Sequence, residues 1–96
     1  MKYQLQVLRQ AREDMQKSFD WYNEQQDGLG ERFISETIRA MHLIETNPFH
    51  YQIKFSKDFR FVLVKNFPFL IVFKIKGKVV VINSIFHTSR NPQKFL

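Results

Sequence analysis

The chain has 96 residues, of which 44% are hydrophobic and 25% are charged, a composition typical of one small globular domain. It has no cysteine, which excludes disulfides and thiolate chemistry, and no apolar run approaches the roughly 20 residues that a membrane span needs. The net charge is +6, with six basic against eight acidic residues in 1–48 and nine against one in 49–96, so the second half favours an anionic partner.

The first predicted element is a half-buried strand over residues 3–7, where Tyr3, Leu5 and Val7 alternate with more polar positions. From about Arg9 the apolar residues recur every three or four positions, which predicts a helix that ends near Gln26. The apolar face expected for this helix consists of Ala11, Met15, Phe19 and Tyr22.

A second helix is predicted after the turn Asp27-Gly28-Leu29-Gly30. Its expected apolar stripe consists of Phe33, Ile34, Ile38, Met41 and Ile44. Asn47-Pro48 ends it, because the residue before a proline disfavours helical backbone. The short connection between the two helices predicts an antiparallel hairpin.

Strand-forming residues dominate the chain beyond Pro48, which contains nine of the 11 phenylalanines. From about Tyr51, the predicted strands are separated by 57–58, by Phe67-Pro68 and by Lys76-Gly77-Lys78. Segments 69–73 and 79–82 are apolar on both faces and are therefore expected as central strands. The order β-α-α-β-β-β predicts an α+β fold in two layers.

The residues that could carry chemistry are few. Three histidines occur without the spacing of a zinc site, and His42 and His50 are expected to be structural. His87 follows the last apolar strand, with Arg90 close behind, so the two could act as acid or base and as phosphate clamp in RNA cleavage. The alternative is that His87 caps the strand end and Arg90 binds a carboxylate. No cofactor or metal is expected.

The adjacent acids Glu13 and Asp14 point in two directions on a helix, so paired-carboxylate chemistry is not expected. Basic residues spread over the second half instead: Lys54, Lys57, Arg60, Lys65, Lys74, Lys76, Lys78, Arg90 and Lys94. Interleaved aromatic side chains could stack on bases or could fill the core. A basic nucleic-acid-binding module is therefore one hypothesis for the function.

Five features in chain order resemble the RelE/ParE superfamily, toxins of type II toxin–antitoxin modules that include plasmid-stabilisation proteins. They are Trp21-Tyr22-x-Glu24-Gln25-x-x-Gly28-Leu29-Gly30-x-Arg32-Phe33, Ile44-x-x-Asn47-Pro48, Arg60, Phe67-Pro68-Phe69-x-Ile71-x-Phe73-x-Ile75 and His87-x-x-Arg90-x-Pro92. The resemblance covers nearly the whole chain and implies a single toxin domain, residues 1–96. It also implies an antiparallel sheet packed against a helical hairpin.

Two activities share that family fold, so the fold cannot choose between them. RelE-like members are ribosome-dependent endoribonucleases that cut mRNA, with lysine and arginine on the sheet. ParE-like members inhibit DNA gyrase without that constellation. Here Leu70 stands where the ribonucleases carry arginine, and Phe61 and Leu63 stand where lysines are expected. The resemblance therefore favours the ParE-like branch, for which no enzymatic activity is expected; in the ribonuclease alternative, the chain would be a ribosome-dependent endoribonuclease with His87 and Arg90 as catalytic residues.

In either branch the resemblance implies a cognate antitoxin, whose disordered tail folds onto the toxin. The target would be DNA gyrase, or the ribosome and its mRNA in the alternative branch, and the protein would act in the cytoplasm without a membrane partner. Arg60, Lys74 and Arg90 are the expected contacts with antitoxin or target.

Overall fold

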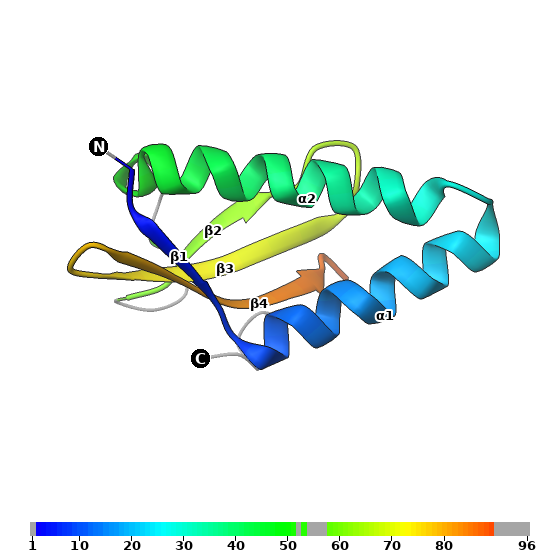
Figure 1. Cartoon of the computed structure of the whole chain (residues 1–96), viewed down its shortest axis with the longest axis horizontal. Helices are drawn as coiled ribbons and strands as arrows, with labels where there is room; N and C mark the ends of the chain where they lie inside the picture. Colours follow the sequence, from blue (N-terminus) through cyan, green and yellow to red (C-terminus); the bar gives the residue numbers. More distant parts are fainter. Residues whose placement is uncertain (1, 52, 54–57, 90–96) are drawn as a thin grey trace.

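The computed structural model describes residues 2–51, 53 and 58–89. In chain order its elements are β1 (Gln4–Val7), α1 (Arg9–Gln25), α2 (Leu29–Thr46), the 3-10 turn η1 (Pro48–His50), β2 (Arg60–Leu63), β3 (Phe69–Lys76) and β4 (Val79–His87). Two helices pack on a four-stranded sheet, which confirms the predicted two-layer α+β fold and its β-α-α-β-β-β order (Figure 1). No described helix has the length and apolar character that a bilayer crossing requires.

The sheet has the strand order β1-β4-β3-β2. Strands β2, β3 and β4 are antiparallel, as expected, whereas β1 pairs with β4 in parallel. The helical hairpin explains this, because it returns the chain to the end where β1 began: the Tyr3 N–H donates to the Glu45 carbonyl at 2.9 Å. Strand β2 therefore runs in the same direction as β1. Because β3 is antiparallel to β2 and β4 is antiparallel to β3, β4 also runs in the direction of β1.

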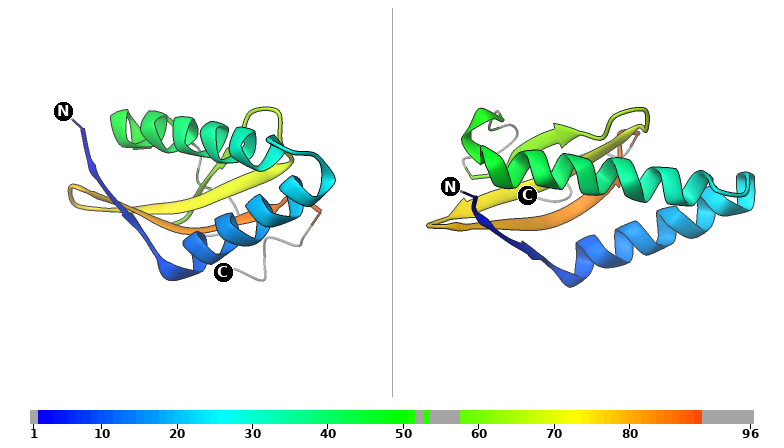
Figure 2. Two further views of the ribbon diagram at one scale, coloured as in Figure 1. Left: turned by 45° about the vertical axis from the view of Figure 1, so that its right-hand side comes forward. Right: turned by 45° about the horizontal axis from the view of Figure 1, so that its top comes forward.

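Both helices lie on one face of the sheet (Figure 2). The core between the layers contains Ala11 and Tyr22 from α1 and Phe33, Met41 and Ile44 from α2, against apolar residues of β3 and β4. The predicted stripe of α2 is thus confirmed except at one position, since Ile38 is 42% exposed. Its place toward the sheet is taken by Thr37, whose hydroxyl is satisfied by the Phe33 carbonyl at 2.8 Å.

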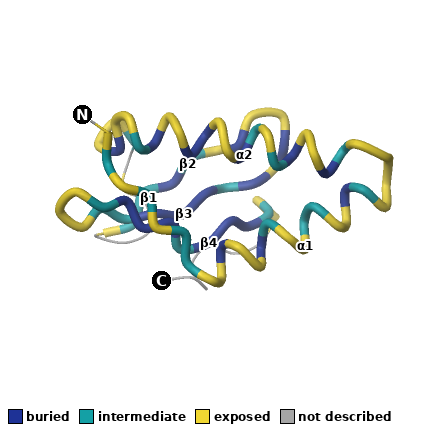
Figure 3. The backbone as a smooth tube through the Cα atoms, viewed as in Figure 1, coloured by how far each residue is buried: buried dark blue, intermediate teal, exposed yellow. Residues whose placement is uncertain are grey.

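The opposite face of the sheet also carries apolar side chains. Phe61, Val72 and Phe86 form a second buried cluster there, with Phe59 and Leu70 packed against it. Strands β3 and β4 are therefore apolar on both faces, as their sequences predict, and the burial of both strands is plain in Figure 3.

Glycines make the two tight connections possible. Gly28 has φ +85° between the helices and Gly77 has φ +58° between β3 and β4, conformations that residues with a Cβ rarely adopt. Gly30 serves differently: it lies in the first turn of α2, where an added Cβ would lie 2.6 Å from the Phe19 carbonyl oxygen of α1. Close approach of the two helices therefore depends on Gly30.

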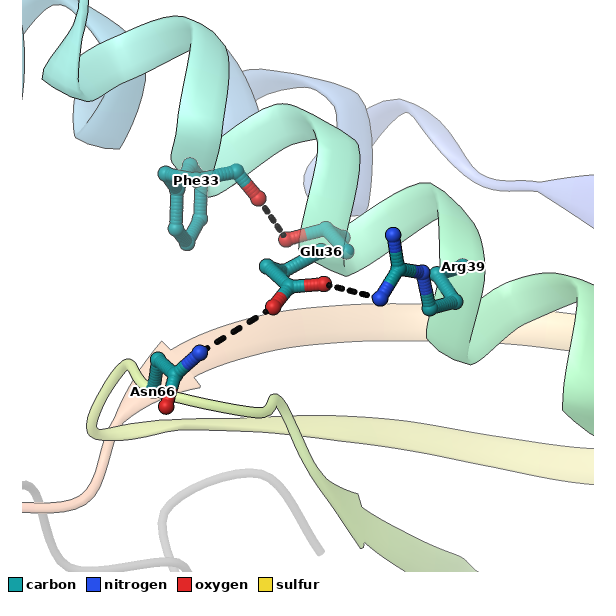
Figure 4. Close-up of polar contacts among 5 residues, drawn as sticks. Phe33, Glu36, Arg39 and Asn66 are labelled. Atoms are coloured by element: carbon teal, nitrogen blue, oxygen red, sulfur yellow. Dashed lines mark hydrogen bonds and ion pairs between the residues drawn. The ribbon is translucent and has the colours of Figure 1, made fainter.

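The turn between β2 and β3 is fastened to α2 (Figure 4). Asn66 has φ +68° there, and its Nδ2 donates to Glu36 Oε2 at 3.2 Å. Glu36 also forms an ion pair with Arg39 at 3.3 Å. Asparagine tolerates the left-handed region better than most residues, and the Glu36 carboxylate helps to hold it there.

Candidate functional site

The candidate site forms where β1 ends and α1 begins. Strand β1 covers β4 only from Val79 to Ile82, and the Leu8 N–H donates to the Ile82 carbonyl before the chain turns into α1. Beyond that point Asp14 of α1 takes the place of a strand, because its Oδ2 accepts the Ile85 N–H at 2.9 Å. Gln10 Nε2 donates to the other carboxylate oxygen at 2.8 Å.

A groove of about 660 Å³ runs between α1 and this part of β4. Its lining residues come from α1, from the start of β3 and from the end of β4: Gln10, Asp14, Lys17, Ser18, Trp21, Tyr22, Pro68, Phe69, Ile85, Phe86, His87 and Ser89. The described lining is therefore mixed: it contains aromatic and aliphatic side chains, several polar groups and one lysine, Lys17.

Aromatic rings build one wall of the groove. The Tyr22 ring lies 5.1 Å from those of Trp21 and Phe67, and 5.4 Å from that of Phe33. Desolvation by burial raises the pKa of Tyr22 above its ordinary value of 10.0. Trp21, by contrast, lines the groove and is 57% exposed.

His87 lines the groove, but its Nδ1 is already occupied. The Ser89 N–H donates to that atom at 3.1 Å, and the Ser89 hydroxyl lies 2.8 Å from it. An Nδ1 that accepts a backbone N–H carries a lone pair, so the neutral ring holds its proton on Nε2. That tautomer can donate from Nε2 but offers no free lone pair to a substrate. The geometry matches a strand-end cap, one of the two roles expected for His87.

The other predicted site residues do not meet in this groove. Arg60 Nη1 donates to the Tyr51 carbonyl at 2.5 Å, and its guanidinium lies 5.1 Å from the Phe49 ring centre. Lys74 lies over the Phe59 ring at 5.6 Å. Because Arg60 pairs with Phe73, Lys74 points to the opposite face of the sheet. Arg90 lies outside the described residues.

The remaining histidines lie apart from the groove. On α2, the Nδ1 of His42 forms a hydrogen bond with Glu45 Oε1 at 2.6 Å. His50, the last residue of η1, contacts the ring of Tyr51. Within the described ranges, no three histidine or acidic side chains are placed to hold a metal ion.

The sequence interpretation missed the α1 wall of the groove. Four residues of α1 share one face at helical spacing: Ala11, Asp14, Ser18 and Tyr22. Ala11, Asp14 and Tyr22 are buried, whereas Met15 and Phe19, which the sequence places on the apolar face, are only half-buried. The helical spacing that places Asp14 on the same face as Ala11 and Tyr22 indicates a buried carboxylate on this wall. Glu13 is exposed and Asp14 is buried, so the two carboxylates do diverge as expected.

The arrangement is suited to binding a polypeptide segment. It combines an exposed tryptophan, apolar walls and a stretch of β4 that no described strand covers on that side. Extended or helical segments bind proteins through such grooves and strand edges. It lacks the cluster of cations that phosphoryl transfer requires, because Lys17 is the one lysine or arginine among the described lining residues.

Comparisons with known proteins agree with the fold described above. A family model described as "ParE toxin of type II toxin-antitoxin system, parDE" matches residues 5–92. A solved structure entitled "Chromosomal ParDE TA system from P. aeruginosa" has a similar fold, with a TM-score of 0.82 and 17% sequence identity over 90% of this chain and 96% of that one. No curated protein sequence matches the chain.

Proposed function

The chain belongs to the ParE toxin family of type II toxin–antitoxin systems, and from this premise we propose that it arrests bacterial growth by binding DNA gyrase and is neutralised by a cognate antitoxin. The observation that carries the proposal is the family match over residues 5–92; a groove lined by the exposed Trp21, with Lys17 as the one described lysine or arginine in its lining, supports it. We further propose that residues 1–96 act as one toxin domain in the cytoplasm.

The geometry supports the ParE-like activity over the ribonuclease alternative. RNA cleavage needs a base to take a proton and cations to stabilise the developing phosphorane charge. His87 has its Nδ1 lone pair engaged by Ser89. Leu70 and Phe61, at positions expected to be cationic in a ribonuclease, pack in the apolar cluster on the far face of the sheet.

We assign antitoxin binding to the groove between α1 and β4. Apolar anchors of an antitoxin segment would pack on Trp21 and Pro68, which are both exposed at the groove, and an acidic residue of that segment would meet Lys17. The +8 charge of residues 49–96 would speed association with an acidic tail. Burial of an exposed tryptophan is the kind of contact that dominates binding energy.

Arg60, Lys74 and Arg90 remain proposed contacts with target or antitoxin. These residues differ in how freely their side chains could contact a partner. The Arg60 guanidinium already donates a hydrogen bond to the Tyr51 carbonyl, and in a complex it would either retain that bond or replace it with one to the partner. Lys74 and Arg60 lie on opposite faces of the sheet, so a single flat partner would contact one of the two.

Induced expression in a bacterium without antitoxin, with DNA and protein synthesis pulse-labelled in parallel, tests this function. We expect DNA synthesis to fall first, and co-expression of the antitoxin to restore growth. A first fall in protein synthesis would favour the ribonuclease alternative, with His87 and Arg90 as its candidate catalytic residues. Normal growth without antitoxin would contradict the toxin function of this chain.

A further inference from the structure

Lysines gather at the end of the sheet that is farthest from the groove's aromatic wall. Strands β3 and β4 are joined there by Gly77 and Lys78, and this hairpin reaches beyond the ends of both helices (Figure 1). Lys76, Gly77 and Lys78 are all exposed, as the yellow tip in Figure 3 shows. Positive φ at Gly77 alone matches a type II′ turn, which keeps the tip narrow.

The face of the sheet away from the helices adds lysines on β3 and side-chain amides on β1. Lys74 and Lys76 are two residues apart on β3 and share that face. Lys76 pairs with Val79, which in turn pairs with Gln4 of β1, so Gln4 lies on the same face. Gln6 follows two residues later and is also exposed.

Lys2 adds to the same end of the sheet. It lies two residues before Gln4, whose N–H donates to the Lys78 carbonyl at 2.9 Å, and Tyr3 between them packs toward the core. The lysine face is therefore defined by four cations, Lys2, Lys74, Lys76 and Lys78, with the amides of Gln4 and Gln6 beside them. The ion pairs of Glu36 with Arg39 and of Glu45 with His42 both lie on α2, away from these lysines.

We propose that the lysine face binds the phosphate backbone of duplex DNA, an interaction beyond the antitoxin and gyrase contacts proposed above. Lysines are compact point charges that suit contact with phosphates, and side-chain amides also donate to phosphate oxygens. Because Lys74 and Lys76 lie on β3 whereas Lys2 precedes β1, with β4 between these two strands, the lysines offer a broad surface rather than a pocket for one small anion.

The same surface does not suit single strands, which bind through exposed aromatic platforms. Among the described residues, the ring that one of these lysines contacts is that of Phe59, with Lys74 over it at 5.6 Å. An acidic peptide would in turn need apolar anchors, and the groove that offers them lies on the helix side of the sheet. Duplex DNA is therefore the partner that this surface fits best.

Fluorescence anisotropy with a labelled 30-base-pair duplex tests the proposal, without antitoxin or gyrase in the assay. Four phosphate contacts predict that log K falls with log salt concentration with a slope of about −3.6, which is roughly a hundred-fold loss of affinity between 50 and 200 mM salt. The double variant Lys76→Gln/Lys78→Gln should lower affinity at 50 mM and bring the slope to about −1.8.

Arg32→Gln/Lys65→Gln is the charge-matched control, because both residues are exposed and lie away from the hairpin. It should keep the wild-type slope within about half a unit, and thermal melting should confirm that both variants fold. The proposal is overturned if the control weakens binding as much as the hairpin variant, or if the wild type does not bind duplex at 50 mM salt. Tighter binding of single-stranded RNA or of polyglutamate, lost in the hairpin variant, would also overturn it. Because gyrase is absent, these outcomes are independent of the toxin proposal.

Discussion

The carboxylate of Asp14 and the backbone N–H of Ile85 meet at 2.9 Å although 71 positions separate them in the chain. The bond joins α1 to β4 just beyond the point where β1 stops pairing. A side chain thus satisfies a buried strand edge that a longer β1 would otherwise cover. This contact fixes the width of the groove by holding its two main walls together.

Asp14→Ala should destabilise the fold by about 1–3 kcal/mol, because it leaves the buried Ile85 N–H without an acceptor. Urea unfolding measures this loss, and hydrogen exchange at the Ile85 amide should quicken. Glu13→Ala, on the exposed side of the same helix, is the control and should change stability by less than about 0.5 kcal/mol. Equal stabilities of the two variants would contradict the role assigned to Asp14.

Gly30→Ala should destabilise by about 1–3 kcal/mol, since its Cβ would press against the Phe19 carbonyl and the Asn23 side chain. Gly28→Val should cost about 1 kcal/mol or more for a different reason, the positive φ at that position. Gly28→Asn tests whether backbone conformation is the cause at this position, because asparagine tolerates positive φ and should retain most of the stability. Unfolding in urea ranks the three; a stable Gly30→Ala would show that the helices can move apart without cost.

Trp21→Ala should weaken antitoxin binding ten-fold or more, equivalent to about 1.4 kcal/mol, without lowering the melting temperature. Trp21 is the only tryptophan in the sequence, so its emission should also shift to shorter wavelength when antitoxin covers the groove. Leu43→Ala removes an apolar side chain of similar exposure, 58%, outside the groove lining and should leave affinity unchanged. Identical effects of the two variants would place the antitoxin elsewhere.

Stability at alkaline pH should depend on Tyr22. Burial raises its pKa above 10.0, so the unfolded chain releases the phenolic proton before the folded protein does. The contribution of the neutral hydroxyl is therefore complete below pH 10 and is lost as pH rises through the folded pKa. Tyr22→Phe should show a smaller fall in unfolding free energy than wild type above pH 10; parallel curves would contradict this assignment.

Local patterns in the sequence predict most of the fold. The opening strand, both helices, the Gly28 turn, the strand start after Pro68 and the Gly77 turn all occur where periodicity and turn residues predict them. The parallel pairing of β1 with β4 is a different matter, because it depends on the path of the whole chain and on no local pattern. Ile38 was predicted in the buried stripe of α2 but is exposed. Helical spacing identifies the apolar side of a helix, but it does not show which residues on that side a neighbouring element covers.

The candidate site is less visible in the sequence. His87 is predicted to follow the last strand; the structure has it as the final residue of β4, where it lines the groove. The role of Asp14 depends on a backbone group of β4 that β1 leaves uncovered, and that follows only from the length and pairing of β1. Arg60 and Lys74, both predicted as partner contacts, lie on different faces of the sheet.

The most direct test of the proposed toxin activity is a supercoiling assay with purified DNA gyrase, relaxed plasmid and the wild-type protein beside His87→Ala. We expect both proteins to inhibit supercoiling or to trap cleaved DNA, because the Nδ1 of His87 is occupied by Ser89 and the activity requires no catalytic base. Unaffected gyrase at excess protein, together with cleavage of ribosome-bound mRNA that His87→Ala abolishes, would contradict the gyrase proposal and favour the ribonuclease alternative.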